Sequence, residues 1–205
     1  MQLNAAGLLT SLPIEIMAVS KAQRIEKIRP LIEQGYRLFG ENRVQEAQEK
    51  WPTLLAEFPT CQLHLIGHLQ SNKVKQAVEL FHSIEVIDRL TLVDALIKNL
   101  SLPTVRTQEF LIQINIGEEP QKTGVLPSDF SDLYQYCKNK NLPIHGLMGI
   151  PPAGQDPRPY FGKLKNIAQE HHLKILSMGM SQDYETAIKC GSTRIRLGTA
   201  LFGPR

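Results

Sequence analysis

Strand-like apolar segments alternate with amphipathic, helix-like segments along almost the whole chain of 205 residues. Strands that alternate with helices pair in parallel, because each helix returns the chain to the same end of the sheet. We expect strands at residues 14–20, 36–40, 62–67, 83–88, 110–117, 143–150, 174–179 and 193–198. We expect helices at residues 24–34, 42–57, 72–80, 90–99, 127–139, 158–171 and 182–190.

Eight strands with helices between them predict an α/β fold, a single (β/α)8 TIM barrel at the small end of its usual length. An open, doubly wound sheet is the alternative, but no G-x-G-x-x-G turn follows the first strand. The eight units use nearly the whole sequence, so we expect residues 1–205 to form one domain.

The composition argues against several other classes of protein. The net charge is only +3 and no dense run of Lys and Arg is present, which argues against nucleic acid as a partner. No apolar stretch approaches the roughly 20 residues that span a bilayer. The first residues lack the basic region of a secretory signal, so we expect a cytoplasmic protein. Cys61, Cys137 and Cys190 lie far apart, which indicates reduced thiols rather than disulfides.

The segment IEIMAVSK ends an apolar strand on Lys21. One interpretation is that the strand has reached the surface and the Lys21 ammonium extends into water. The other is that the amine is shielded from water, has a lowered pKa and attacks a carbonyl. Side chains alternate along a strand, so Met17, Val19 and Lys21 share a face. Lys21 then lies at the end of the strand where barrels place their functional groups.

The segment TRIRLGTALFG shows the same alternation. If Ile195 and Leu197 pack against the outer helices, Arg194, Arg196 and Gly198 face the barrel interior. An arginine there needs a hydrogen-bond acceptor, because its guanidinium stays charged in proteins. A glycine at a strand end that leads into a short helix is typical of the phosphate site that barrels build after their last two strands.

The segment SMGMSQD ends the preceding strand at Gly179 and predicts a helix that begins at Ser181. Serine is a favoured N-cap, which explains this residue about as well as ligand binding does. Together with Gly198 and Thr199 after the neighbouring strand, however, Ser181 predicts a cup of hydroxyl and N–H groups that suits a phosphate.

Pyridoxal phosphate (PLP) carries an aldehyde, a ring nitrogen and a phosphate. Its enzymes hold it through a lysine Schiff base and give the ring nitrogen a charged partner. The chain offers one group for each of these handles: Lys21 for the aldehyde, Arg196 for the ring nitrogen, and the predicted cup for the phosphate. We therefore interpret these residues as a PLP site.

Six motifs then carry a resemblance to a known family over nearly the whole chain. They are AVSK (18–21), FGENRVQEA (39–47), HLIGHLQSNK (64–73), GLMGIPP (146–152), SMGMSQDYETAI (177–188) and RIRLGTALFG (194–203). In these motifs the sequence resembles the pyridoxal-phosphate homeostasis proteins (the YggS/PROSC family). Its barrel is similar to the N-terminal domain of alanine racemase.

The resemblance implies that Lys21 carries PLP covalently, as an internal aldimine. It also implies a further set of cofactor-binding residues, in which Arg196 meets the ring nitrogen, three residues hold the phosphate and three lie beside the ring. The phosphate residues are Ser181, Gly198 and Thr199, and the ring-side residues are Asn42, His68 and Met148.

The sequence departs from the family pattern at its start, and one loop offers a second amine. Members usually begin with a longer helix, whereas residues 1–13 alone precede the first strand here, so the bottom of the barrel is expected to be less well covered. Lys122, in the loop EEPQKTG, is either a second cofactor-handling amine or a solvated lysine, and base rates favour the latter.

Three functions remain open from the residues. The first is a non-catalytic PLP-binding protein that buffers PLP in PLP homeostasis and delivers it to apo-enzymes, as the resemblance implies, and that we expect to be a monomer. The second is a PLP-dependent racemase or lyase. An arginine at the ring nitrogen makes the cofactor a poorer electron sink, and no tyrosine is placed to act as a second base. Both features disfavour a racemase or lyase. The third is a Schiff-base aldolase, which has no pyridine nitrogen for Arg196 to meet.

Two further pairs have structural interpretations. His64 and His68 are four residues apart, so on one strand they would face the same way, but no third metal ligand is visible and we expect no metal. Glu46 and Lys50 suit an i,i+4 ion pair on a helix, which is structural rather than catalytic.

Overall fold

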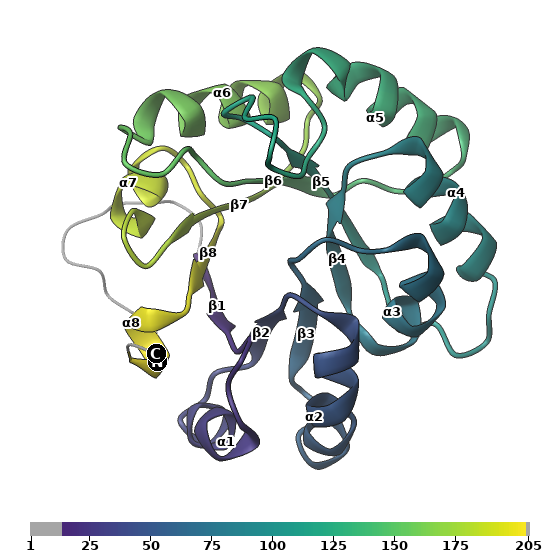
Figure 1. Cartoon of the computed structure of the whole chain (residues 1–205), viewed down its shortest axis with the longest axis vertical. Helices are drawn as coiled ribbons and strands as arrows, with labels where there is room; N and C mark the ends of the chain where they lie inside the picture. Colours follow the sequence, from purple (N-terminus) through teal and green to yellow (C-terminus); the bar gives the residue numbers. More distant parts are fainter. Residues whose placement is uncertain (1–13, 204–205) are drawn as a thin grey trace.

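The computed structural model describes residues 14–203, and these form a closed barrel of parallel strands with helices around the outside (Figure 1). The strands follow one another around the barrel in chain order, from the first to the eighth. The predicted (β/α)8 barrel is therefore confirmed, and the doubly wound alternative is wrong. The short segment before the first strand, residues 1–13, lies outside the described residues.

The strands and helices follow the predicted order closely. The strands are β1 (Glu15–Val19), β2 (Leu38–Glu41), β3 (Gln62–Leu65), β4 (Ser83–Ile87), β5 (Glu109–Ile114), β6 (Gly146–Gly149), β7 (Ile175–Met180) and β8 (Arg194–Leu197). The helices are α1 (Ile25–Glu33), α2 (Val44–Glu57), α3 (Val74–Leu80), α4 (Leu90–Asn99), α5 (Phe130–Asn139), α6 (Arg158–Glu170), α7 (Tyr184–Lys189) and α8 (Thr199–Phe202). Short 3-10 turns, Ser71–Lys73 and Pro127–Asp129, precede α3 and α5.

The predicted fifth strand, 110–117, is too long at its end. The strand stops at Ile114 because the Asn115 side chain turns the chain. Its Nδ2 donates to the carbonyl oxygen of Glu119, and its Oδ1 accepts from the Glu119 N–H. Side-chain bonds of this kind compete with the strand ladder and favour a turn.

The register between β1 and β8 decides which side chains enter the barrel. Met17 pairs with Arg196 and Ala18 with Leu197. Ile195 and Leu197 pack outward with Ile188 of α7 in one hydrophobic cluster. Since side chains alternate along a strand, the arginines of β8 face the interior, as the sequence predicts.

Between the barrel and its helices lies an apolar layer that is almost completely buried. Phe39 of β2 lies against Trp51 of α2 with ring centroids 5.0 Å apart, and both side chains are fully buried. Burial of large apolar side chains on the outer face of every strand is the main force that holds helices to a parallel sheet. None of the helices in residues 14–203 combines the length and the apolar character needed to cross a membrane.

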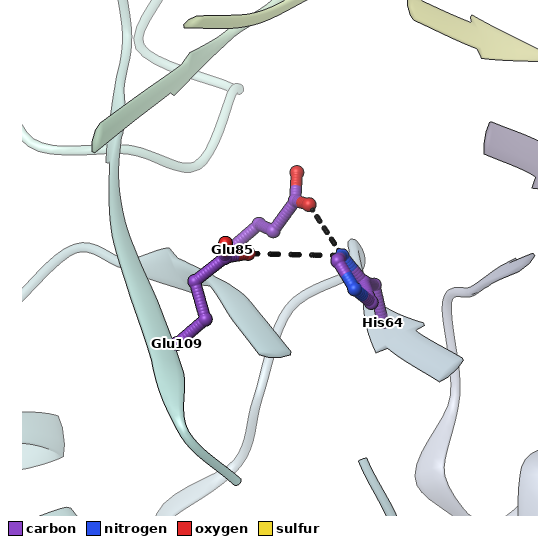
Figure 2. Close-up of side chains that lie close together, drawn as sticks. All are labelled: His64, Glu85 and Glu109. Atoms are coloured by element: carbon purple, nitrogen blue, oxygen red, sulfur yellow. Dashed lines mark hydrogen bonds and ion pairs between the residues drawn. The ribbon is translucent and has the colours of Figure 1, made fainter. Parts of the chain in front are cut away.

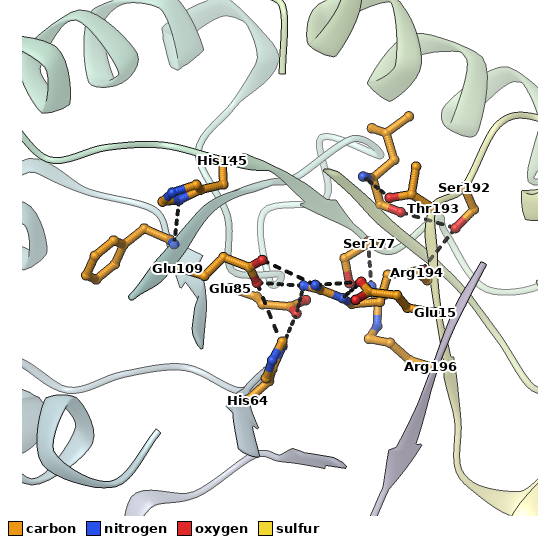
Figure 3. A network of polar contacts seen from close by, with 12 residues as sticks. Glu15, His64, Glu85, Glu109, His145, Ser177, Ser192, Thr193, Arg194 and Arg196 are labelled. Carbon is orange, nitrogen blue, oxygen red and sulfur yellow. Dashed lines mark hydrogen bonds and ion pairs between the residues drawn. The ribbon is translucent and has the colours of Figure 1, made fainter. Parts of the chain in front are cut away.

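Charged groups lie in the half of the barrel interior that is nearer the amino ends of the strands. We call them the floor (Glu15, His64, Glu85, Glu109 and Arg194; Figure 3). The Arg194 guanidinium lies at its centre. Its Nη1 donates to Glu85 at 2.7 Å and to Glu109 at 2.8 Å, and its Nη2 lies 2.7 Å from Glu15. These carboxylates reach it from three different strands, so the floor ties opposite walls of the barrel together.

Glu85 is fully buried, and its Oε1 also lies 2.9 Å from Nδ1 of His64 (Figure 2). Burial alone would raise the pKa of Glu85, but the hydrogen bond with His64 and the charge of Arg194 outweigh it and lower the pKa to about 2. Glu85 is therefore charged at neutral pH. Its charge is compensated inside the barrel rather than by water.

We expect Arg194→Met to destabilise the fold by about 3–5 kcal/mol, because it leaves the fully buried carboxylate of Glu85 without its cationic partner. Urea unfolding followed by circular dichroism measures the change. Arg29→Met is the matched control, since Arg29 pairs with Glu57 at the surface, where both side chains are more than a third exposed. If the two variants unfold at similar urea concentrations, the floor is not a major source of stability.

Candidate functional site

The predicted site residues lie at the carboxyl ends of the strands, except Met148 and Arg196, which lie on strands. Lys21 follows β1 by two residues, Asn42 comes directly after β2, and Ser181 directly after β7. Gly198 and Thr199 follow β8. All strands of the barrel are parallel, so these ends meet at one mouth, which is where barrels place their functional groups.

Lys21 is half-buried at the point where β1 leaves the sheet. The last ladder bond runs from the Ser20 N–H to the Gly40 carbonyl oxygen at 3.0 Å. The loop after β8 lies close by, since a Cβ built on Gly198 would be 3.8 Å from Cβ of Val19. The end of the strand that carries Lys21 and the predicted phosphate cup are therefore neighbours.

Arg196 is buried inside the barrel, above the floor, and its bonds hold it to β6 and β7. Its Nη1 donates to the carbonyl oxygen of Ser177 at 2.5 Å and to the Ser177 hydroxyl at 2.8 Å, and its Nη2 donates to the Gly149 carbonyl at 3.1 Å. Burial lowers the pKa of Arg196, although a guanidinium stays charged at any ordinary pH. Within the described residues, its recorded partners are all neutral oxygens.

The surroundings of Ser181 correct one prediction, the start of the helix before β8. The last helix before β8 begins at Tyr184 with Asp183 at its N-cap, so a helix start at Ser181 is wrong. Asp183 stabilises the turn before this helix instead, because its Oδ1 accepts the Met180 N–H at 2.6 Å. Ser181 Oγ accepts the N–H groups of Gly198 and Ala200, each at 3.3 Å. These two N–H groups belong to the N-cap and the second residue of α8.

The cup residues, Ser181, Gly198 and Thr199, thus lie side by side at the mouth. Thr199 is exposed, and Gly198 and Ser181 are half-buried. Backbone N–H groups, two hydroxyls and solvent access together suit an anion such as a phosphate.

Asn42 offers a buried acceptor that the rest of the described protein leaves without a hydrogen bond. Its Oδ1 is buried and has no partner. The backbone of Gly67 packs directly against Asn42, since a Cβ on Gly67 would lie 2.3 Å from the Asn42 carbonyl oxygen. A buried polar atom without a partner is costly, so Asn42 Oδ1 is one feature of this mouth that a bound polar ligand would satisfy.

His68 and Met148 lie in different surroundings. The His68 side chain is 47% exposed on the rim, with Nδ1 3.8 Å from the Asp88 carboxylate. Met148 is fully buried, and the register places it between Gln113 and Ser177 on the face that lines the interior.

Lys122 joins two loops of the rim. Its Nζ lies 2.5 Å from the Glu119 carboxylate and donates to the Pro151 carbonyl oxygen at 3.2 Å. Lys122 therefore connects the loop after β5 to the proline-rich loop after β6, while its side chain stays 30% exposed.

The two histidines of the third unit do not come together. His64 lies in the floor, whereas β3 ends at Leu65 and His68 lies on the rim, so the expectation that they face the same way is wrong. His64, Glu85 and Glu109 do place ligand atoms within 4.8 Å of one another (Figure 2). The Arg194 guanidinium already bonds to both carboxylates, which is the role that a cation would otherwise take.

Sequence reasoning missed the surroundings of the Lys21 loop. The predicted Glu46–Lys50 pair is confirmed at 2.7 Å, but Lys50 is buried and its Nζ also lies 2.8 Å from Glu41. The available signal in the sequence was Glu41, which ends the apolar strand segment FGE. A carboxylate in such a buried place needs a buried partner.

Comparison with known proteins places this chain in a family. The sequence model of the alanine racemase N-terminal domain matches residues 2–205. The pyridoxal phosphate homeostasis protein of Aquifex aeolicus is 38% identical over 201 residues, which cover 93% of this chain and 87% of that protein. The chain belongs to the pyridoxal phosphate homeostasis protein family.

Solved structures of one relative agree with this assignment. PipY of Synechococcus elongatus without PLP has a TM-score of 0.85 and 36% identity, and the match covers 94% of this chain and 95% of PipY. PipY with PLP bound has a TM-score of 0.82 at the same identity, over 93% of this chain and 92% of PipY. The barrel predicted from the alternation of strands and helices is thus the fold of the family.

Gly179 sets the path of the loop that carries Ser181. Its φ is +94°, and a Cβ there would lie 2.5 Å from Cβ of Ala187. We expect Gly179→Ala to destabilise the protein by about 1–3 kcal/mol, measured by thermal or urea unfolding.

The matched control is Gly162→Ala, which lies inside α6, where the added Cβ would have no atom of residues 14–203 within 4 Å apart from the backbone of its own helix. It should be neutral or stabilise the protein by about 0.5–1 kcal/mol. Equal stability of the two variants would show that the backbone at residue 179 is not constrained.

Proposed function

We propose that this protein binds PLP reversibly, with the cofactor attached to the amine of Lys21 as a Schiff base, and that it serves PLP homeostasis. Membership of the family supports the role, and PipY, which is 36% identical, has been solved with PLP bound. PLP supplies an aldehyde that condenses with a lysine amine. Lys21 lies at the mouth, two residues after the end of β1.

The observation that carries the proposal is Arg196. A buried guanidinium faces the interior below the mouth and is held in place by two strands. Its three recorded bonds use three of the five N–H donors of a guanidinium, so two remain for an acceptor such as a pyridine nitrogen. Because Arg196 stays charged, it would keep that nitrogen unprotonated.

The residues present fit the phosphate as well. Gly198 and Ala200 direct N–H groups to the Ser181 hydroxyl, and the Thr199 hydroxyl lies exposed beside them. A phosphate could accept these N–H groups, while Ser181 and Thr199 donate their hydroxyl protons to it. The proposed contacts beside the ring are His68, Met148 and Asn42, whose Oδ1 has no hydrogen-bond partner in the described part of the chain.

A binding role fits these residues better than racemase or lyase chemistry. An unprotonated ring nitrogen stabilises a carbanion poorly, and a racemase also needs a second base. Among the tyrosines near the rim, the Tyr160 hydroxyl bonds to Gln155 and the Tyr184 hydroxyl to Glu185. A Schiff-base aldolase has no pyridine nitrogen, so that function offers no ligand group for the buried guanidinium of Arg196.

We propose that the bound cofactor is buffered in the cytoplasm by a monomer and is passed to PLP-dependent apo-enzymes. An open mouth supports this role, because Thr199 and His68 are exposed and a loosely enclosed cofactor can leave. Because the cofactor is attached through one lysine, hydrolysis of the Schiff base is the only covalent step that its release requires.

The first test is the visible spectrum of the purified protein after incubation with PLP, followed by borohydride reduction and peptide mass mapping. We expect an absorbance band of the lysine-bound cofactor and a pyridoxyl group on Lys21. A colourless protein that gains no pyridoxyl group would reject the proposal and favour the aldolase. An assay of amino-acid turnover separates a carrier from a racemase or lyase.

The phosphate cup has its own test. The double variant Ser181→Ala with Thr199→Val should raise the Kd for PLP about tenfold more than the Kd for pyridoxal, a difference of about 1.4 kcal/mol. Pyridoxal has the aldehyde and the ring but no phosphate, so it serves as the control ligand. Equal effects on both ligands would contradict the assignment of the cup.

A further inference from the structure

The loop that carries Lys21 is held by side chains from the next β/α unit. Lys50 of α2 extends its ammonium to the carbonyl oxygens of Ser20 at 3.1 Å and of Gln23 at 3.2 Å. These two carbonyls lie on either side of Lys21 in the sequence. One buried cation therefore fixes the backbone before and after the residue that carries the amine.

Glu46, one helical turn before Lys50, holds the residue after Lys21. Its Oε1 accepts the Ala22 N–H at 2.5 Å and lies 2.7 Å from the Lys50 Nζ. Ala22 has a φ of 58°, in the left-handed region that a residue with a Cβ rarely adopts. A strained residue persists where its surroundings fix it, and such residues gather at functional sites.

Glu41 completes the cluster from β2. It is fully buried, and its Oε1 lies 2.7 Å from Ser20 Oγ, 2.8 Å from the Lys50 Nζ and 3.0 Å from Trp51 Nε1. The second oxygen, Oε2, is buried and has no hydrogen-bond partner among residues 14–203. We call Glu41, Glu46 and Lys50 together the clamp.

The clamp is an expensive way to hold an ordinary turn. Each of two charges buried on the outer side of the barrel loses its water, and the gain from pairing them often does no more than offset that loss. Apolar residues of similar size would hold α2 to β1 as well. What the charges add is direction, because hydrogen bonds to three backbone groups around Lys21 allow only one path for the loop.

We infer that Glu41, Glu46 and Lys50 are positioning residues for Lys21, which fix its backbone so that its amine meets the aldehyde of PLP at the mouth. This inference rests on the proposed function. A misplacement of about 1 Å in a reacting group lowers reactivity by up to roughly a hundredfold, so a loose loop would weaken attachment without removing any contact with the ligand.

The test separates attachment from binding by using two ligands. PLP needs Lys21 for attachment, whereas pyridoxamine 5′-phosphate has the same ring and phosphate but no aldehyde. We expect Glu46→Ala and Lys50→Met to reduce the equilibrium constant for attachment of PLP to Lys21 roughly tenfold or more. The attached fraction is measured as the pyridoxyl group that borohydride traps on Lys21. Binding of pyridoxamine 5′-phosphate should stay within about twofold, because the ring and phosphate contacts are unchanged.

Two further variants control for charge and for the helix. Glu46→Gln keeps an oxygen that can accept the Ala22 N–H and should recover most of the attachment. Glu49→Ala removes an exposed carboxylate from the same helix and should behave as the unmodified protein. Thermal unfolding of each variant measures the stability, and Glu46 is the milder site because its side chain is 27% exposed.

The outcomes distinguish the two proposals. If Glu46→Ala weakens both ligands equally, or leaves PLP attachment unchanged, the clamp is only structural and the inference is wrong. If the unmodified protein binds pyridoxamine 5′-phosphate but never carries a pyridoxyl group on Lys21, the proposed anchor fails instead. Attachment lost selectively in Glu46→Ala and regained in Glu46→Gln supports the inference.

Discussion

The pairing of β8 with β1 is the constraint on which the rest of the structure depends. It closes the barrel, and its register determines that Met17 and Arg196 enter the interior while Ile195 and Leu197 face the helices. A shift of one residue would exchange the two faces, because side chains alternate along a strand. The arginines of β8 would then lie in the apolar layer with no acceptors. Closure in this register therefore gives the barrel both its stability and its interior charge.

The interior has two levels with different electrostatics. In the floor, Arg194 is surrounded by carboxylates, so its charge is compensated within the protein. One layer higher, Arg196 bonds only to neutral oxygens among the described residues. Ser177 connects the levels, since it pairs with Arg194 in the sheet register and accepts a hydrogen bond from Arg196. The charge of Arg194 is thus compensated in the floor, whereas Arg196, one layer nearer the mouth, bonds to no carboxylate among the described residues.

The mouth itself is built from loops that rigid elements hold in place. Hydrogen bonds from neighbouring units fix the loop with Lys21, and Ser181 ties the end of β7 to the start of α8. Lys122 joins the loops after β5 and β6. Groups on different loops keep a fixed arrangement only when such contacts restrict the loops, because connecting segments are otherwise the most mobile part of a fold.

The sequence by itself determined the barrel, the inward direction of Arg194 and Arg196, and the position of Lys21, Ser181 and Thr199 at strand ends. These features follow from local periodicity, which a single strand or helix expresses on its own. Only the tertiary structure decided that Ser181 accepts N–H groups at the start of α8 rather than capping α7, that His64 and His68 separate, and that Glu46 and Lys50 reach the Lys21 loop. Each of these depends on contacts between units that are far apart in the sequence or on where a strand ends. Periodicity carries no information about such contacts.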